Sequence, residues 1–290
     1  MKKKLVKNKD GLLSVNKKPS QQELKNLYKN LYYQKNLSKT YKKRYSHDEI
    51  KFNELNFRLF QLFFKRKHKS ILDIGTGEGY LLSFFIKQNY KCYGVDYSKH
   101  GMISQNPRLL KKIEFVNCDI IENNFFIGKT FDIIFLMNVA EHVPNFNILI
   151  KKIYKKLKKG GLLIIKVPNE YDIVHKKYLK NNNLKKEQLA IFNPLHHLNY
   201  FNKDSLKKSV LNNVDLKCLT MYSDFPIEIF ILNKFTNYYK NKSFGKNAHD
   251  LRVKMTNLLA EHNQLDKILK YYQVSLELGL GRNITAIFEK

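Results

Sequence analysis

The chain has 290 residues, and 43% of them are hydrophobic, which is enough to bury a core in one large domain or two small ones. A formal net charge of +28 ordinarily indicates a nucleic acid or an anionic membrane surface as partner. However, 47 of the 53 basic residues are lysines, whereas bidentate recognition of phosphates and bases depends on arginine. We therefore interpret the charge as a compositional bias and do not expect nucleic acid to be the main partner.

Cysteine content and apolar runs bear on the compartment. The three cysteines are scattered and form neither a disulfide framework nor a Cys-x-x-Cys zinc motif, so we expect a reducing, cytoplasmic environment. The basic N-terminus lacks the continuous apolar stretch of a signal peptide. The longest apolar runs, such as residues 133–137, fall well short of the roughly 20 residues that cross a bilayer. We expect no transmembrane segment, while peripheral membrane contact and the oligomeric state stay open.

The first 67 residues carry apolar side chains at helical spacing, and we predict a helical N-terminal extension over residues 1–67. The clearest series are Leu24, Leu27, Tyr28 and Leu31, and then Phe52, Leu55, Leu59 and Leu62. The same segment contains a cluster of tyrosines, namely Tyr28, Tyr32, Tyr33, Tyr41 and Tyr45. Such a stripe fits either the lining of a ligand cleft or, more commonly, the buried face of a helix.

From residue 70 onward, short apolar runs alternate with helix-length stretches, as strands and crossover helices do in a parallel sheet. The predicted strands are residues 70–74, 91–95, 113–117, 131–137, 161–167, 214–222 and 283–289. Helical patterns occur at residues 248–259 and 265–278. We predict an α/β fold with a doubly wound, Rossmann-like core over residues 68–223. A helical cover is inserted at residues 224–281, and residues 282–290 supply the last core strand.

A glycine-rich loop follows the first predicted strand of this core. Gly75, Gly77 and Gly79 come directly after Asp73-Ile74 and before a helical run, where glycines let the backbone approach a ligand closely. The dinucleotide fingerprint Gly-x-Gly-x-x-Gly requires a third glycine where this chain has Tyr80. The spacing therefore favours a nucleotide-like cofactor and disfavours NAD.

Two carboxylates stand at the ends of the next two strands. Asp96 lies about 20 residues beyond the glycine loop, where an acidic side chain accepts the ribose hydroxyls of an adenosine. Asp119 ends the third strand and fits either an acceptor for the adenine amino group or a turn-capping residue. Together they predict an adenosine-containing ligand.

This series of motifs resembles that of class I S-adenosylmethionine-dependent methyltransferases. The matching stretches are residues 72–79, 94–98, 119, 131–134 and 157–165. The resemblance implies S-adenosylmethionine as cofactor and a seven-stranded methyltransferase sheet whose last strand is reversed. The residues that we assign to the cofactor are Asp73, Gly75, Thr76, Gly77, Gly79, Asp96, Tyr97, Asp119, Ile120 and Asn138.

Outside the core, the chain resembles bacterial methyltransferases of surface-polysaccharide biosynthesis clusters. The stretches that carry this resemblance are residues 138–143, 167–169, 194–201, 224–228 and 279–283. It implies a hydroxyl or amine of a sugar, in a nucleotide-sugar or polysaccharide intermediate, as the methyl acceptor. An RNA or DNA methyltransferase is the alternative suggested by charge, although the chain lacks an Asn-Pro-Pro-Tyr or Asp-Pro-Pro-Tyr motif after the fourth strand. A non-catalytic protein that binds the cofactor is the third reading.

A hydroxyl acceptor must lose a proton, and imidazole titrates near the working pH. His197 and then His142 are the preferred catalytic bases, with His196 as a third candidate, although each also fits a structural histidine. Glu141-His142 resembles the acidic-histidine pair of ubiquinone-pathway O-methyltransferases, some of which use a divalent metal. Those enzymes carry another glutamate where this chain has Asn138, so we predict no metal. Asp224, Glu228, His249 and Arg282 in or beside the cover are either substrate contacts or surface residues.

Overall fold

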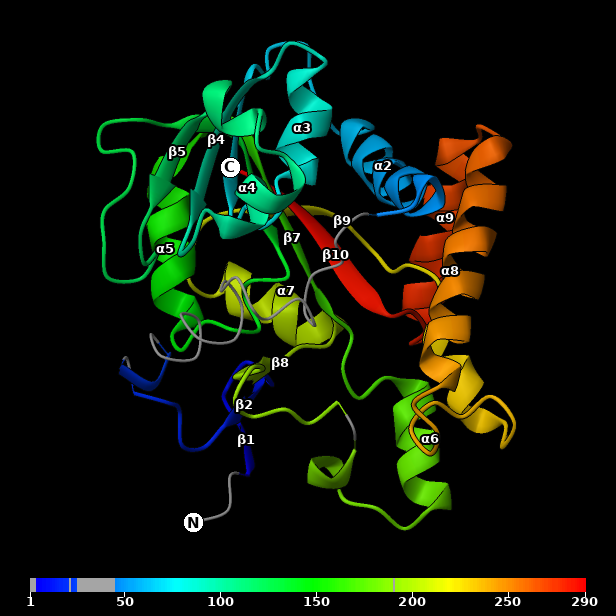
Figure 1. The fold of residues 1–290 in the computed structure, drawn as a ribbon. Helices are drawn as coiled ribbons and strands as arrows, with labels where there is room; N and C mark the ends of the chain where they lie inside the picture. Colours follow the sequence, from blue (N-terminus) through cyan, green and yellow to red (C-terminus); the bar gives the residue numbers. More distant parts are fainter. Residues whose placement is uncertain (1–3, 21, 25–44, 190) are drawn as a thin grey trace.

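The computed structural model describes residues 4–20, 22–24, 45–189 and 191–290. A seven-stranded sheet forms the centre of the fold, with helices on both faces (Figure 1). In spatial order it contains β5 (Glu114–Asn117), β4 (Lys91–Asp96), β3 (Ser70–Ile74), β6 (Phe131–Met137), β7 (Leu157–Pro168), β10 (Asn283–Glu289) and β9 (Lys217–Tyr222). The first five of these strands are mutually parallel, whereas β10 runs antiparallel to both β7 and β9. The predicted seven-stranded α/β sheet with a reversed last strand is confirmed.

The apolar runs form strands because both faces of the sheet are buried. In β6, Ile133 and Phe135 pack on one face, against α2 (His47–Gln61) and α3 (Tyr80–Ile86). Ile134 and Leu136 pack on the other face, against α5 (Phe146–Lys156) and α7 (Lys203–Leu211). The alternation of side chains along each strand thus builds two cores at once.

One predicted strand starts later than expected. The sixth strand was predicted at 214–222, but β9 begins at Lys217. The backbone N–H of Val214 donates to the carbonyl of Val210, so this apolar residue belongs to the turn that ends α7. The pattern of apolar residues alone does not separate a helix end from a strand start.

The prediction that residues 1–67 are helical is correct for only part of the segment. The helix α2 contains the series from Phe52 to Leu59, and Ser46 and Glu49 form a capping box at its N-terminus. In contrast, β1 (Leu5–Lys7) and β2 (Leu13–Val15) form an antiparallel hairpin, and β2 also pairs with β8 (Asn199–Tyr200). That pairing is made with residues about two-thirds of the chain away, which a local pattern does not reveal. Tyr28, Tyr32, Tyr33 and Tyr41 lie outside the described residues.

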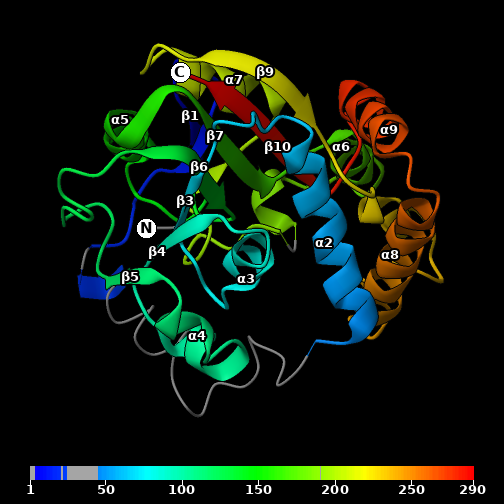
Figure 2. The same cartoon turned by 90° about the horizontal axis from the view of Figure 1, so that it is seen from above.

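The segment before β10 is helical, as predicted. It contains η4 (Ile227–Leu232), α8 (Phe244–Glu261) and α9 (Leu265–Glu277), and α8 lies against α2 at one side of the sheet (Figures 1 and 2). The amide of Asn257 donates to the carbonyl of Asp48 at 2.9 Å, which ties the cover to the N-terminal extension. The remaining elements are α4 (His100–Gln105), η2 (Leu109–Lys111), α6 (Ile173–Asn181) and η3 (Lys186–Gln188). None of the described helices is long and apolar enough to span a membrane.

Candidate functional site

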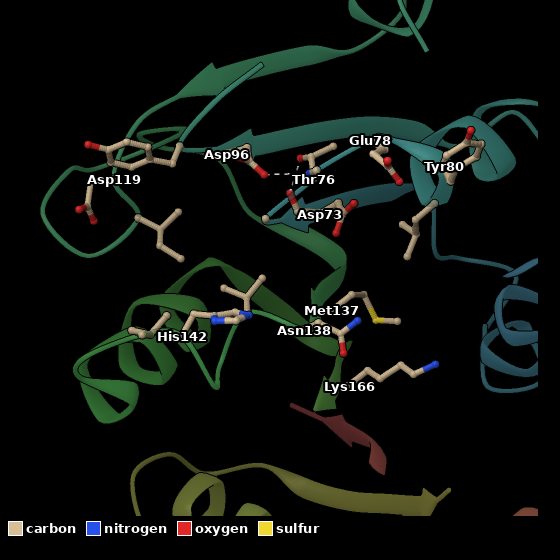
Figure 3. A pocket seen from close by; sticks show the side chains of 18 of the residues that line it. Asp73, Thr76, Glu78, Tyr80, Asp96, Asp119, Met137, Asn138, His142 and Lys166 are labelled. Atoms are coloured by element: carbon tan, nitrogen blue, oxygen red, sulfur yellow. Dashed lines mark hydrogen bonds between the residues drawn. The ribbon is translucent and has the colours of Figure 1, made fainter. Parts of the chain in front are cut away.

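A cavity of about 560 Å³ opens at the carboxyl ends of the parallel strands β3 to β7 (Figure 3). This edge of an open α/β sheet is where such folds bind ligands, and the volume lies in the range of small-molecule sites. The lining includes all ten residues assigned to the cofactor from the sequence, namely Asp73, Gly75, Thr76, Gly77, Gly79, Asp96, Tyr97, Asp119, Ile120 and Asn138. The fold brings them together from four strand ends, while their binding roles stay predictions.

The glycine loop lines this cavity. Gly75, Gly77 and Gly79 have φ angles of 77°, 54° and 77°, a region that favours glycine. A Cβ atom at Gly75 would lie 2.3 Å from the side chain of Val139, and one at Gly79 would lie 2.6 Å from that of Leu109. The loop therefore needs glycine for its backbone angles and, at Gly75 and Gly79, for close packing against neighbouring side chains.

Asp96 fixes the loop in place from the end of β4. Its Oδ2 accepts a hydrogen bond from the N–H of Gly77 at 2.8 Å, and its Oδ1 accepts one from the N–H of Ser98 at 2.9 Å. Each carboxylate oxygen has two lone pairs, so these bonds leave capacity to accept ligand hydroxyls. The carboxylate is thus held rigidly at the cavity wall.

Asp119 acts as a turn residue and also lines the cavity. Its Oδ1 accepts hydrogen bonds from the N–H groups of Ile121 at 2.8 Å and Glu122 at 3.3 Å. The two sequence interpretations of this residue are therefore compatible, since one oxygen caps the turn while the carboxylate borders the cavity.

Two further carboxyl groups lie near the glycine loop with one oxygen buried and without a hydrogen-bond partner in the described part of the chain. They are Asp73, at Oδ1, and Glu78, at Oε1. Burial, and then the charge of Asp96, raises the pKa of Asp73 to about 8. Burial also raises the pKa of Glu78, although a hydrogen bond with Tyr45 opposes the change. A positively charged ligand would stabilise the ionised form of both groups, because it replaces the solvation that the carboxylates lose on burial.

His142, one of the predicted bases, comes from the segment that follows β6. His142 lines the cavity, and its Nδ1 is 2.7 Å from the carbonyl oxygen of His196. Because a carbonyl only accepts, Nδ1 carries the proton and Nε2 is the acceptor. Burial, and then the charge of His197, lowers the pKa of His142 to about 4, so its imidazole is neutral near pH 7.

His197, ranked first from the sequence, is not among the residues that line the cavity. Its Nδ1 is 2.6 Å from Oε1 of the buried Glu170, and its ring lies edge-on to that of His142 with centroids 5.1 Å apart. Burial lowers the pKa of His197, but the bond to Glu170 outweighs burial and the net change is upward. His196 lies in the same segment, and burial lowers its pKa.

Glu141, His142 and His197 each offer one ligand atom, and these atoms lie within 4.8 Å of one another. The Oε2 atom of Glu141 is buried and has no hydrogen-bond partner in the described ranges, and burial raises its pKa to about 8. In the sequence, Asn138 in place of a glutamate disfavours a metal, and His197 lies more than 50 residues from the Glu141-His142 pair that it joins in the fold. The absence of a metal stays a prediction.

Several residues that line the cavity lie outside the sequence motifs, and Lys166 is the most informative of them. It stands near the end of β7 and is the single charged residue in the apolar run 162–167, a signal that was present in the sequence. From α2, Asn53, Asn56 and Phe57 also reach the cavity.

The interpretation of the cover residues as exposed is wrong for two of them. Asp224 and Glu228 are buried, and each forms an ion pair with an arginine. The Nη2 of Arg252 lies 2.5 Å from Oδ2 of Asp224, and the Nη1 of Arg282 lies 2.9 Å from Oε1 of Glu228. Burial raises the pKa of Asp224, but the charges of Arg252 and Lys166 outweigh burial and lower it. In contrast, burial raises the pKa of Glu228 despite the opposing charge of Arg282.

Known proteins resemble this chain over its central part. Residues 45–220 match the methyltransferase domain family. (S)-Coclaurine N-methyltransferase from Thalictrum flavum subsp. glaucum is 26% identical over 132 residues, which are 42% of this chain and 36% of that protein. Ubiquinone biosynthesis O-methyltransferase from Coxiella burnetii (strain Dugway 5J108-111) is 31% identical over 129 residues, which are 42% of this chain and 54% of that protein. The matched regions thus span about a third to a half of these relatives.

A solved structure resembles the whole described fold. The plantazolicin methyltransferase BpumL in complex with SAH superposes with a TM-score of 0.55 at 19% identity, over 92% of this chain and 95% of that one. The superposition shows a shared fold, and at 19% identity it shows no more than that. The family match, in turn, includes more than half of the chain and the strands that carry the cavity. The chain therefore belongs to the methyltransferase domain family and has the fold of S-adenosylmethionine-dependent methyltransferases.

Proposed function

We propose that this protein uses S-adenosylmethionine to methylate a hydroxyl or amine of a small polar acceptor. The expected acceptor, from the sequence resemblance, is a sugar in a nucleotide-sugar or surface-polysaccharide intermediate. The two relatives above are named for transfer to nitrogen and to oxygen, which supports either acceptor atom. A cytoplasmic location belongs to the same proposal and is supported by the free thiols of Cys92, Cys118 and Cys218.

The cavity fits this cofactor in shape and charge. Asp119 and Ile120 would hold the adenine, and Asp96 would accept the ribose hydroxyls. S-adenosylmethionine carries a positive sulfonium and a positive ammonium group, and it supplies a methyl group that the sulfonium already activates. Asp73 and Glu78 provide the buried, unpaired carboxylate oxygens that such a cation requires. This match of charge is the observation that carries the proposal.

The protein's own part in the reaction is alignment, exclusion of water and proton removal. We assign the proton acceptor to Nε2 of His142, because this residue borders the cavity and its pKa keeps the imidazole neutral. Nε2 of His142, which takes up the proton, lies 3.6 Å from Oε1 of Glu141. His197, held by Glu170, is then a positioning residue behind His142.

Methyl transfer to candidate acceptors tests the proposal. The purified protein is incubated with S-adenosylmethionine carrying a tritiated methyl group and a panel of sugar nucleotides, free sugars and lipid-linked saccharides. We expect label in at least one sugar compound. Tight cofactor binding with no label in any acceptor would instead support the non-catalytic reading.

An RNA acceptor is the second candidate, because the net charge of +28 favours polyanions. The same assay with total RNA, repeated at rising salt, separates the two. Label that enters RNA and declines steeply with salt would favour this candidate over a sugar.

A further inference from the structure

We propose that Lys166 forms an anion-binding subsite for the methyl acceptor, so that the acceptor carries a carboxylate or phosphate near the methylated group. This inference rests on the proposed function, because it concerns the acceptor end of the same cavity. It assigns a binding residue to the anionic group of the acceptor and extends the requirement for such a group beyond nucleotide-sugars.

The ammonium group of Lys166 is buried yet lies in the cavity wall. The residue is 7% exposed and lines the cavity, and Figure 3 shows Lys166 and His142 on opposite sides of Asn138. Its Nζ is 3.4 Å from Oδ1 of Asn56, a long hydrogen bond. An ammonium has three N–H donors, so this bond leaves donor capacity toward the cavity.

The charge of Lys166 is only partly balanced by its nearest carboxylate. Oδ2 of Asp224 lies 3.8 Å from Nζ, beyond hydrogen-bond distance. The same oxygen is 2.5 Å from Nη2 of Arg252, and Asp224 also accepts two hydrogen bonds from Asn283 at 2.7 and 2.8 Å. Two basic side chains therefore share one carboxylate beside the cavity, and burial lowers the pKa of Lys166, although the charge of Asp224 opposes this change. Buried charges are normally paired, and an anionic ligand next to Nζ would pair with the ammonium group of Lys166.

The order of the strands indicates that the anion belongs to the acceptor. Asp119 follows β5, Asp96 ends β4, the glycine loop follows β3, Asn138 follows β6, and Lys166 lies near the end of β7. The residues proposed for adenosine thus lie on the β5 side of the glycine loop. Lys166 lies on the other side, on β7, which is two strands from β3 and therefore roughly 10 Å from it for a strand spacing of about 4.8 Å. The N–H of Asn138 donates to the carbonyl of Lys166 at 2.8 Å, so Lys166 adjoins the segment that carries His142.

The carboxylate of the cofactor itself is the other possible source of the anion, and the experiment separates the two. Lys166→Met removes the charge and keeps the apolar stem, Lys166→Arg keeps the charge, and Lys87→Met on the exposed end of α3 is the matched control. Each variant is first checked by thermal unfolding. Calorimetry then measures binding of S-adenosylhomocysteine and of 5′-methylthioadenosine, which lacks the amino-acid part.

Acceptor-side binding is measured on protein saturated with S-adenosylhomocysteine. The probes are two matched pairs, UDP-glucose with glucose, and 3,4-dihydroxybenzoate with 3,4-dihydroxybenzaldehyde. We expect at least one anionic probe to bind about tenfold tighter than its neutral partner, the size expected for a charge-assisted hydrogen bond. Lys166→Met abolishes this preference, Lys166→Arg and Lys87→Met retain it, and S-adenosylhomocysteine affinity changes less than about twofold.

Two results overturn the inference. One is the absence of any anion preference in the wild-type complex. The other is a Lys166→Met variant that loses affinity for S-adenosylhomocysteine but not for 5′-methylthioadenosine, because Lys166 would then hold the cofactor's carboxylate. Failure of the wild-type protein to bind S-adenosylhomocysteine would refute the proposed function itself, so the two failures are distinguishable.

Discussion

The carboxyl group of Asp73 makes cofactor binding depend on pH. Its pKa is raised to about 8, because burial disfavours the charged form and Asp96 adds a like charge. Near pH 7 the free protein therefore holds Asp73 mainly protonated. A cationic ligand prefers the ionised form, so binding releases a proton and the affinity falls as the pH falls below about 8.

The magnitude follows from the fraction of ionised carboxyl in the free protein. With a pKa of about 8, this fraction drops from about one half at pH 8 to about one hundredth at pH 6. If the bound cation keeps the carboxyl ionised over this range, the affinity for S-adenosylmethionine falls roughly 50-fold, or ~2.3 kcal/mol. Asp73→Asn removes the ionisation while keeping the shape, and it therefore binds more weakly at pH 8 and without this pH dependence.

Isothermal titration calorimetry between pH 6 and 8 measures this effect, and buffers of different ionisation enthalpy count the released proton. Uncharged 5′-methylthioadenosine is the control ligand, and its affinity changes little with pH. A wild-type affinity for S-adenosylmethionine that is constant from pH 6 to 8 would refute the reasoning. An Asp73→Asn variant that retains the wild-type slope would refute it as well.

Three further substitutions test the site and the fold. His142→Gln lowers the rate of methyl transfer by about 100-fold or more and leaves S-adenosylhomocysteine binding unchanged, whereas His197→Gln has a smaller effect. Equal losses in both variants would contradict the assignment of the proton acceptor to His142. Gly75→Ala places a Cβ 2.3 Å from the Val139 side chain at a φ of 77°, and we expect urea unfolding to show a loss of roughly 1–3 kcal/mol. Val139→Ala then restores part of this loss, and no recovery would indicate that backbone strain alone is responsible. Burial raises the pKa of Asp132, but hydrogen bonds from its neighbours outweigh burial and lower the pKa to about 2. Its contribution to stability is thus present above the unfolded pKa and is lost as the pH falls toward 2. In acid titrations followed by circular dichroism, Asp132→Asn loses this contribution at neutral pH and shows a smaller decline between pH 4 and 2 than the wild type.

The sequence was informative wherever a feature depends on neighbouring residues. Strands such as β6 were predictable because they are buried on both faces and thus apolar throughout. The glycine loop was predictable because positive φ angles and close packing leave little choice but glycine at Gly75 and Gly79. The position of Asp96 was predictable as well, because it ends β4 and the carboxyl ends of parallel strands lie at the edge of the sheet that binds ligands.

Features that depend on distant partners were missed. The hairpin of β1 and β2 is completed by β8, and neither its register nor its partner is visible in residues 5–15. Asp224 and Glu228 are polar in the sequence, yet both are buried, where each forms an ion pair with an arginine from another part of the chain.

From the sequence alone, the succession of strands along the chain, the glycine loop and the carboxylates at the strand ends were determined, because short-range patterns encode them. Only the tertiary structure decided which histidine borders the cavity, since His142 and His197 are brought together by a contact between distant loops. It also decided that Lys166 lines the cavity with an incompletely balanced charge, because that balance depends on Asp224 and Arg252 from the cover. Electrostatic pairing acts through space rather than along the chain, so the sequence does not contain it in readable form.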